Sequence, residues 1–151
     1  MRTMYKAIST GFGLFAAALL LPAIPVSAES PARSELQIAV SYVEAYNARD
    51  LPAMLALMHD DIEWLSIEGS EVAAFASGKA DLAAQMEAYL KSPGATFSTV
   101  EGSVGDGRFV AVREVAHWQD ADGNARSQSA LAVYEIVDGL IRRVWYYPAT
   151  R

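Results

Sequence analysis

The chain contains no cysteine and only two histidines among its 151 residues. Without cysteine there can be no disulfide, no thiol nucleophile and no lipid attached at the end of a leader peptide. The fold must therefore rest on its hydrophobic core, which a domain of this length can supply without a large margin.

Basic residues are also scarce. The chain has 12 Lys and Arg against 18 Asp and Glu, a formal net charge of −6. No segment carries a basic stripe, and a surface of this sign repels nucleic acid and anionic membranes. We expect no nucleic-acid partner.

A long hydrophobic run occurs only near the N-terminus. Arg2 and Lys6 precede the apolar run Ala7–Leu21, and Val26–Ala28 ends in the small-x-small pattern of a signal-peptidase site. This pattern predicts a signal peptide over residues 1–28 that is cleaved after Ala28. An uncleaved membrane anchor is the alternative, but the run is shorter than the roughly 20 residues that span a bilayer.

Cleavage there leaves a mature chain of 123 residues that is periplasmic or secreted and has no membrane partner. The leader carries two basic residues and no acidic one, so the mature chain has 10 basic and 18 acidic residues and a formal charge of −8. We assign residues 29–34 to a polar linker and residues 35–151 to one domain.

Two helices that meet at a sharp corner organise the first half of this domain. Ser34 and Gln37 have the spacing of a capping box, and Asp50 with Pro52 is typical of a second helix start. The expected elements of this half are helices at 35–47, 51–59 and 80–90, a strand at 62–67, and a short strand or loop at 71–75.

From residue 95 onward the hydrophobic period changes to two. Strands are expected at 95–104, 108–119, 126–137 and 140–147, and Asp-Gly pairs at 106–107 and 138–139 predict tight hairpins. The pattern indicates an α+β domain with three helices on one side of a curved antiparallel sheet. Both sheet faces carry apolar residues, so a homodimer across the face that the helices leave open is expected.

The order of these elements resembles the nuclear transport factor 2-like (NTF2-like) superfamily, and within it the SnoaL-like and ketosteroid-isomerase-like branch. The resemblance is carried by Tyr-x-x-Ala-Tyr-Asn-Ala-Arg-Asp-Leu at 42–51 and Asp-Asp-Ile-Glu-Trp at 60–64. It implies a cone-shaped fold with an apolar cavity. Members of the superfamily include isomerases, polyketide cyclases, dehydratases and non-catalytic binding or oligomerising domains.

The resemblance carries over only in part to the ketosteroid isomerase site. Tyr42 matches the tyrosine that donates a hydrogen bond to the developing oxyanion. Ser66 stands where those enzymes have their aspartate base, and Ala132 stands near their protonated aspartate. Ketosteroid isomerisation by the known arrangement is therefore not expected.

Three residues are candidates for catalysis. Tyr42 could bind a substrate oxygen, or it could be a packed tyrosine with its hydroxyl at the rim. Glu114 could be a general acid or base if its strand face lines the cavity, or it could pair with an arginine such as Arg142. His117 could transfer protons, but strand alternation points it away from Glu114 and favours a surface or interface role.

A further set of residues should line the cavity: Tyr46, Trp64, Ser66, Phe75, Tyr89, Trp118, Ala132, Tyr134 and Tyr146. Asp60, Asp61 and Glu63 match no known spacing of metal ligands, so neither a metal nor a cofactor is expected. The sequence thus predicts binding of a small, largely apolar organic molecule, with isomerase, cyclase or dehydratase chemistry left open. The alternative is a non-catalytic binding domain, or an oligomerisation domain that acts through its sheet surface.

Overall fold

The computed structural model describes residues 34–147. The predicted signal peptide, its cleavage site, and all of the predicted linker except Ser34 lie outside the described residues. No helix among residues 34–147 is long and apolar enough to cross a membrane.

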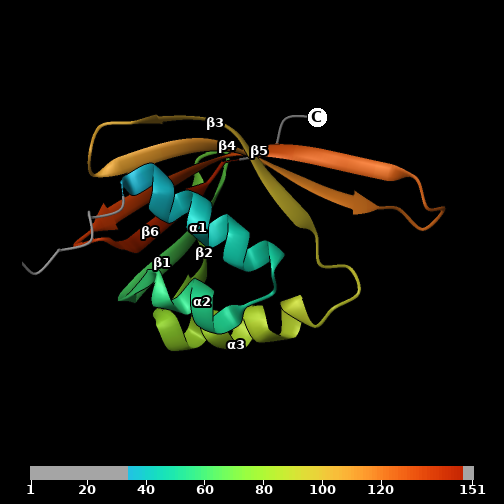
Figure 1. Cartoon of the computed structure of the whole chain (residues 1–151), viewed down its shortest axis with the longest axis horizontal. Coiled ribbons are helices and arrows are strands. Elements are labelled where there is room, and N and C mark those ends of the chain that lie inside the picture. The colour runs from blue at the N-terminus through green and yellow to red at the C-terminus, as the bar shows by residue number, and fades with distance from the viewer. Residues whose placement is uncertain (1–33, 148–151) are drawn as a thin grey trace, which may run out of the picture. The chain divides into compact units, whose positions relative to one another are not determined.

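Three helices lie on one side of a curved six-stranded sheet whose strand order is β2-β1-β6-β5-β4-β3 (Figure 1). Strand β1 pairs with β6 in parallel, and all other neighbours are antiparallel. The elements are α1 (Glu35–Asn47), α2 (Leu51–Ala56), β1 (Met58–Glu68), β2 (Glu71–Ser77), α3 (Lys79–Leu90), β3 (Phe97–Gly105), β4 (Phe109–Gln119), β5 (Ala125–Val137) and β6 (Leu140–Tyr146).

The predicted α+β class is confirmed, with two corrections to its details. The sheet is mixed rather than wholly antiparallel, because β1 lies beside the last strand of the chain. Helix α3 follows β2, so it is not N-terminal to all the strands. The hairpin of β1 and β2 also shows that the segment at 71–75 is a strand, which extends to Ser77.

Helix α1 begins and ends as its sequence predicts. The Gln37 backbone N–H donates to Ser34 Oγ at 3.3 Å, and the Ser34 N–H donates to Gln37 Oε1 at 2.9 Å. These two bonds satisfy donors that a helix start otherwise leaves unpaired. The helix buries Ile38, Ala39, Tyr42, Val43 and Tyr46 against the sheet.

The corner after α1 ties three elements together. The Asn47 side chain donates to the Ser98 carbonyl at 2.7 Å and accepts from the Ser98 N–H at 2.8 Å, so it acts like a neighbouring strand for β3. Arg49 adopts a left-handed backbone (φ 56°). Its guanidinium donates to the carbonyls of Leu90 and Ala95, each at 3.1 Å. These bonds anchor the loop between α3 and β3.

Helix α2 is shorter than predicted, because its last expected turn belongs to β1. The Ile141 N–H of β6 donates to the Leu57 carbonyl at 2.8 Å, and Met58 pairs with Ile141. Backbone groups that the apolar pattern had assigned to the helix therefore form hydrogen bonds within the sheet. The Met58 side chain is still fully buried, as expected for either structure.

The sheet face that points away from the helices carries exposed apolar side chains and paired charges. Phe97, Phe109, Leu131 and Tyr147 are exposed there. The Glu135 carboxylate is buried and accepts from Arg108 Nε at 2.9 Å and from Arg143 Nη1 at 3.4 Å, and Arg143 also pairs with Glu63. The charges that this face buries are therefore matched by partners of opposite sign.

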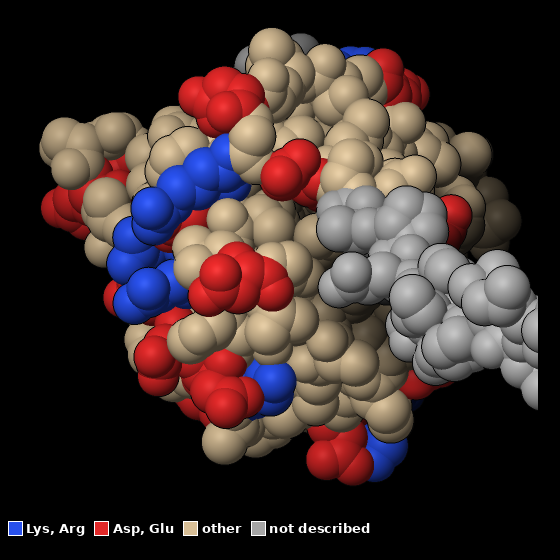
Figure 2. All heavy atoms as spheres, turned by 60° about the vertical axis from the view of Figure 1, so that its left-hand side comes forward, with Lys and Arg blue, Asp and Glu red and all other residues tan. Residues whose placement is uncertain are grey.

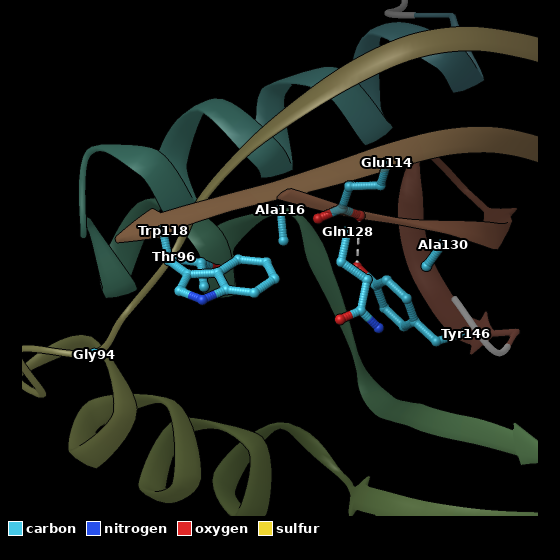
Figure 3. A pocket seen from close by; sticks show the side chains of 8 residues that line it. All are labelled: Gly94, Thr96, Glu114, Ala116, Trp118, Gln128, Ala130 and Tyr146. Atoms are coloured by element: carbon cyan, nitrogen blue, oxygen red, sulfur yellow. Dashed lines mark hydrogen bonds between the residues drawn. The ribbon is translucent and has the colours of Figure 1, made fainter. Parts of the chain in front are cut away.

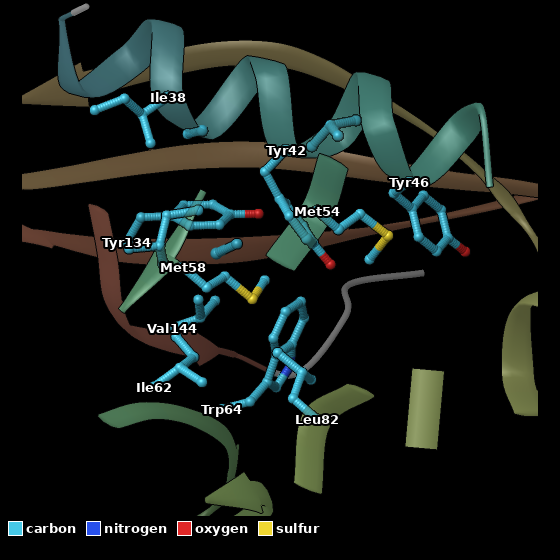
Figure 4. Packing of buried hydrophobic residues seen from close by; sticks show 14 of the residues in the cluster. Ile38, Tyr42, Tyr46, Met54, Met58, Ile62, Trp64, Leu82, Tyr134 and Val144 are labelled. Atoms are coloured by element: carbon cyan, nitrogen blue, oxygen red, sulfur yellow. The ribbon is translucent and has the colours of Figure 1, made fainter. Parts of the chain in front are cut away.

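The core under α1 contains tyrosines as well as aliphatic side chains (Figure 4). Tyr134 and Tyr42 are 0% and 2% exposed, respectively. Burial raises the pKa of both phenols well above the usual value, and the negative charge of Glu114 raises them further. Both tyrosines therefore remain neutral hydrogen-bond donors at ordinary pH.

These raised pKa values predict that alkali destabilises the fold. An unfolded tyrosine ionises near pH 10.0, whereas the buried ones must stay protonated. Their contribution is fully present below that pH and is lost as pH rises toward the folded pKa, so the free energy of unfolding should fall above about pH 10. Urea denaturation across this range, with tyrosinate absorbance followed in parallel, measures the effect. The exposed Tyr147→Phe should leave the slope unchanged, and constant stability up to about pH 12 would contradict the prediction.

Candidate functional site

A hollow lies between the helices and the sheet face that they cover. It has two adjoining lobes of about 340 and 470 Å³, which we call the inner and the outer lobe. Thr96, Glu114, Ala116 and Tyr146 line both lobes. Glu114 therefore stands where the two lobes meet.

The carboxylate of Glu114 is held by two tyrosines. Its Oε2 accepts from the Tyr146 hydroxyl at 2.7 Å and from the Tyr134 hydroxyl at 3.3 Å (Figure 3 shows the first of these bonds). Its Oε1 has no hydrogen-bond partner among the described residues. One oxygen is thus held in place, and the other is free to meet a molecule in the hollow.

Strand alternation explains why Glu114 points inward. Strand β4 pairs with β5 without a bulge, so alternate side chains of β4 share one face. Val110 and Val112 enter the core on that face, and Ala116 and Trp118 continue it into the hollow. The predicted direction of the Glu114 side chain agrees with this placement, and Tyr134 and Tyr146, not Arg142, are its partners.

The inner lobe is lined mainly by aromatic rings. Trp64 stacks on Tyr146 with ring centroids 5.3 Å apart and meets Tyr42 edge-on at 5.5 Å, while Phe75 packs against Trp64 at 6.4 Å. The Tyr42 hydroxyl and the Trp64 indole N–H have no hydrogen-bond partner among the described residues. The lobe therefore combines an apolar wall that suits a flat ring with two free donors.

A cluster of three hydroxyls closes one side of the inner lobe. The hydroxyl of Tyr46 lies 2.8 Å from Thr96 Oγ1 and 3.2 Å from the Tyr89 hydroxyl, which also accepts from the Thr96 N–H at 3.2 Å. Burial raises the pKa of Tyr46, so its phenol stays protonated. Because these hydroxyls bond to one another, they join α1 and α3 to the start of β3 and shape the wall.

The outer lobe is more polar. Trp118 and Gln128 stand on the neighbouring strands β4 and β5, with Ala130 beside Gln128 and Gly94 at the edge of the lobe (Figure 3). Neither the Gln128 amide nor the Trp118 indole N–H has a hydrogen-bond partner among the described residues. The outer lobe therefore offers neutral donors and one neutral acceptor.

The structure brings together most of the side chains that the sequence assigned to the cavity. Tyr42 and Glu114 are joined by the predicted lining residues Tyr46, Trp64, Phe75, Tyr89, Trp118 and Tyr146. Tyr42 has 2% of its surface exposed, but it still forms part of the inner lobe.

His117, the third catalytic candidate, does not line either lobe, and the prediction that it could act on a molecule in the cavity is wrong. It lies on the opposite face of β4, where its Nε2 is 3.0 Å from Thr99 Oγ1 and its ring packs near Phe97. No bulge in the β4–β5 pairing turns it inward.

Three predicted lining residues also do not contribute to the wall of either lobe. Ala132 is fully buried in the core, and Tyr134 lies beneath the hollow, where it supports Glu114. Ser66 pairs with Tyr146 in the sheet, but its short side chain does not reach either lobe.

Several residues that line the lobes were not predicted to do so, and Thr96 and Gln128 are the polar ones that line the outer lobe. Gln128 has the same strand parity as Ala130 and Tyr134, so its inward direction could have been inferred. Thr96 fell within the strand expected at 95–104, but it stands just before β3, and its position in that pattern did not indicate a place in the cavity wall. Among the described residues, no three His, Asp or Glu side chains gather in a way that could hold a metal ion.

Comparison with known proteins places this arrangement in a family. The family model of the SnoaL-like domain matches residues 39–144. No curated protein matches the chain.

Several solved structures have the same fold. The protein Rv0760c of Mycobacterium tuberculosis, in complex with estradiol-17beta-hemisuccinate, has a TM-score of 0.62 and 20% identity, covering 75% of this chain and 92% of that one. The protein TerC, co-crystallised with polyporic acid, has a TM-score of 0.60 and 17% identity over 74% and 88% of the two chains. A protein of Kribbella flavida proposed to be a ketosteroid isomerase has a TM-score of 0.60 and 24% identity over 76% of each chain.

At these identities the structural neighbours show only that the fold is NTF2-like. The family model shows the family, because it matches nearly all the described residues. The chain belongs to the SnoaL-like domain family.

Proposed function

We propose that the protein binds a small, largely apolar ring compound in its hollow and moves a proton on it without a cofactor. The observation that carries this proposal is the Glu114 carboxylate, whose Oε2 is held by Tyr146 and Tyr134 while Oε1 is free at the junction of the lobes. A base that is held in place beside an aromatic cavity suits acid–base chemistry.

The proposed step is removal of a proton from a carbon beside a carbonyl group. Glu114 Oε1 takes the proton, the electron pair of the C–H bond moves toward the carbonyl, and the oxygen becomes negative. The free hydroxyl of Tyr42 donates a hydrogen bond to that oxygen, and its raised pKa keeps it protonated. Return of the proton from Glu114 to another carbon completes an isomerisation. In a dehydratase the enolate would expel a β-hydroxyl, which takes the proton from Glu114 and leaves as water. In a cyclase the enolate carbon would attack a second carbonyl carbon of the same ligand, and the oxygen of that carbonyl would take the proton from Glu114.

This layout differs from the one that the ketosteroid isomerase resemblance implies. There the base stands at the position of Ser66, which does not reach either lobe here. In this chain the carboxylate comes from β4 instead. The molecules in the structures of Rv0760c and TerC support a ring-shaped ligand for this fold, although each of them also carries an acidic group.

A non-catalytic binding protein is the alternative. In that case Glu114 and Tyr42 would only accept and donate hydrogen bonds to a ligand that leaves unchanged. The two functions differ in whether removing the carboxylate abolishes a reaction or only weakens binding.

Substitution at Glu114 and Tyr42 tests the proposal. Native mass spectrometry of the purified protein would identify retained ligands, and deuterium uptake at carbon measured by NMR would report turnover. Glu114→Gln should slow exchange by about a hundredfold or more with the ligand still bound, because the base is lost. Tyr42→Phe should slow it by about a hundredfold, because one oxyanion donor is lost.

The controls for this test are Glu68→Gln and Tyr147→Phe, which change exposed residues outside both lobes. Both should exchange protons at the wild-type rate. Undiminished exchange in Glu114→Gln would remove the proposed base, and a bound ligand with no exchange in any protein would favour the non-catalytic alternative.

We also propose that the protein is exported, on the strength of its N-terminal sequence. Expression of the full chain in a Gram-negative host should place a protein that begins at Glu29 in the periplasm. Intact mass measurement of the fractionated protein checks this. Recovery of a chain that retains its first 28 residues in the membrane fraction would support the anchor instead.

We also propose that the protein forms a homodimer across the sheet face that the helices leave open. Phe97, Phe109, Leu131 and Tyr147 are exposed on this face. The charged side chains on this face form ion pairs. Arg113 pairs with Glu101, Arg108 pairs with Glu135, and Arg143 pairs with both Glu135 and Glu63. Two copies of an acidic protein can approach there with little repulsion.

Light scattering on mature protein measures the oligomeric state. The wild type should be a dimer at micromolar concentration, and Leu131→Glu should shift it to monomer, since a charge would then face its copy. Val72→Glu, at an exposed position on β2, should remain dimeric. A monomeric wild type would overturn the dimer without affecting the cavity.

A further inference from the structure

The hollow has an unusual charge balance. Of the described residues that line the two lobes, Glu114 is the one with a carboxyl group, and none is Lys, Arg or His. A ligand that placed a carboxylate, sulfonate or phosphate against these lining residues would lose part of its hydration and would meet no cation there. The same group would also be repelled by the carboxylate of Glu114.

Basic side chains near the hollow are engaged elsewhere. Arg49 lies near Tyr89, but its guanidinium donates to the carbonyls of Leu90 and Ala95 and does not line either lobe. Arg126, on the strand that carries Gln128, pairs with Asp120 at 2.8 Å. Both guanidinium groups are therefore held by partners outside the two lobes.

One face of the protein surface shows the same excess of acidic side chains (Figure 2). On the face drawn in Figure 2, acidic side chains are spread widely, and most basic ones form a strip among them. The formal net charge of −6 on the whole chain also repels anions at long range.

The outer lobe instead offers neutral polar groups. The Gln128 amide provides two N–H donors and one oxygen acceptor, and the Trp118 indole provides one N–H donor. In Figure 3 the Gln128 amide extends into the space between Trp118 and Tyr146. These groups can bind a hydroxyl or carbonyl of a ligand whose ring occupies the inner lobe.

We propose that the hollow accepts uncharged ligands and rejects anionic ones, and that Gln128 is the residue that meets the polar group of the ligand in the outer lobe. The inference rests on the proposed function only in placing the ligand in the hollow. It does not depend on Glu114 acting as a base.

Two probes that differ by one anionic group test the inference. N-phenylnaphthylamine is neutral and fluoresces in apolar sites, and anilinonaphthalene sulfonate is the same ring system with a sulfonate. Displacement of the neutral probe by the sulfonate should be measured as well, so that binding of the sulfonate elsewhere on the surface is not counted. The wild type should bind the neutral probe at least about tenfold more tightly, because the sulfonate lacks a cation and faces Glu114.

A substitution that should increase the affinity for the anionic probe then tests the role of Gln128. Gln128→Lys should narrow the ratio of the two dissociation constants by about tenfold or more, since a cation would stand in the outer lobe. Gln119→Lys adds the same charge at an exposed position outside both lobes and should leave the ratio within about twofold.

The outcomes separate this inference from the proposed function. Equal binding of both probes by the wild type would overturn the selection while leaving the hollow as the binding site. An unchanged ratio in Gln128→Lys, or an equal change in Gln119→Lys, would overturn the role of Gln128. If neither probe bound, both the selection and the proposed ligand class would be wrong.

Discussion

The structure depends on holding a carboxylate inside a wall of aromatic rings. A charge in such a place is costly unless hydrogen bonds replace the water that it loses. Here the hydroxyls of Tyr146 and Tyr134 meet one oxygen of Glu114, and the hollow remains open to the other. Tyr134 is fully buried, so the carboxylate is fixed from the core rather than from a mobile surface group.

The rest of the fold keeps this arrangement open. Asn47 and Arg49 attach the corner after α1 to β3 and to the loop that follows α3. The Tyr46, Tyr89 and Thr96 hydroxyls hold α1 and α3 at the same loop. Because these bonds are made among the wall residues themselves, the aromatic side chains need not collapse into the space between them.

Local signals in the sequence were sufficient for much of the fold. Ser34 with Gln37 located the start of α1, and strand alternation gave the direction of both Glu114 and His117. Such signals depend on neighbours within a few residues. The end of α2 could not be predicted in this way, because the Leu57 carbonyl accepts a hydrogen bond from Ile141 in the last strand, far away in the sequence.

The site was harder to predict for the same reason. Thr96 joins the wall only because Tyr46 and Tyr89 reach it from distant helices, and Tyr134 supports Glu114 from beneath rather than lining the hollow. A pattern that marks a side chain as inward does not say whether it faces a cavity or the packed core. Ala132 and Tyr134 show this difference, since both point inward on β5 and both are fully buried.

The most direct test of the account is a crystal structure of the protein with N-phenylnaphthylamine bound. We expect the probe's rings against Trp64 and Tyr42 in the inner lobe, and its amine within hydrogen-bond distance of Glu114 Oε1. A probe bound elsewhere, a hollow filled by its own side chains, or a protein donor on Oε1 would contradict the account.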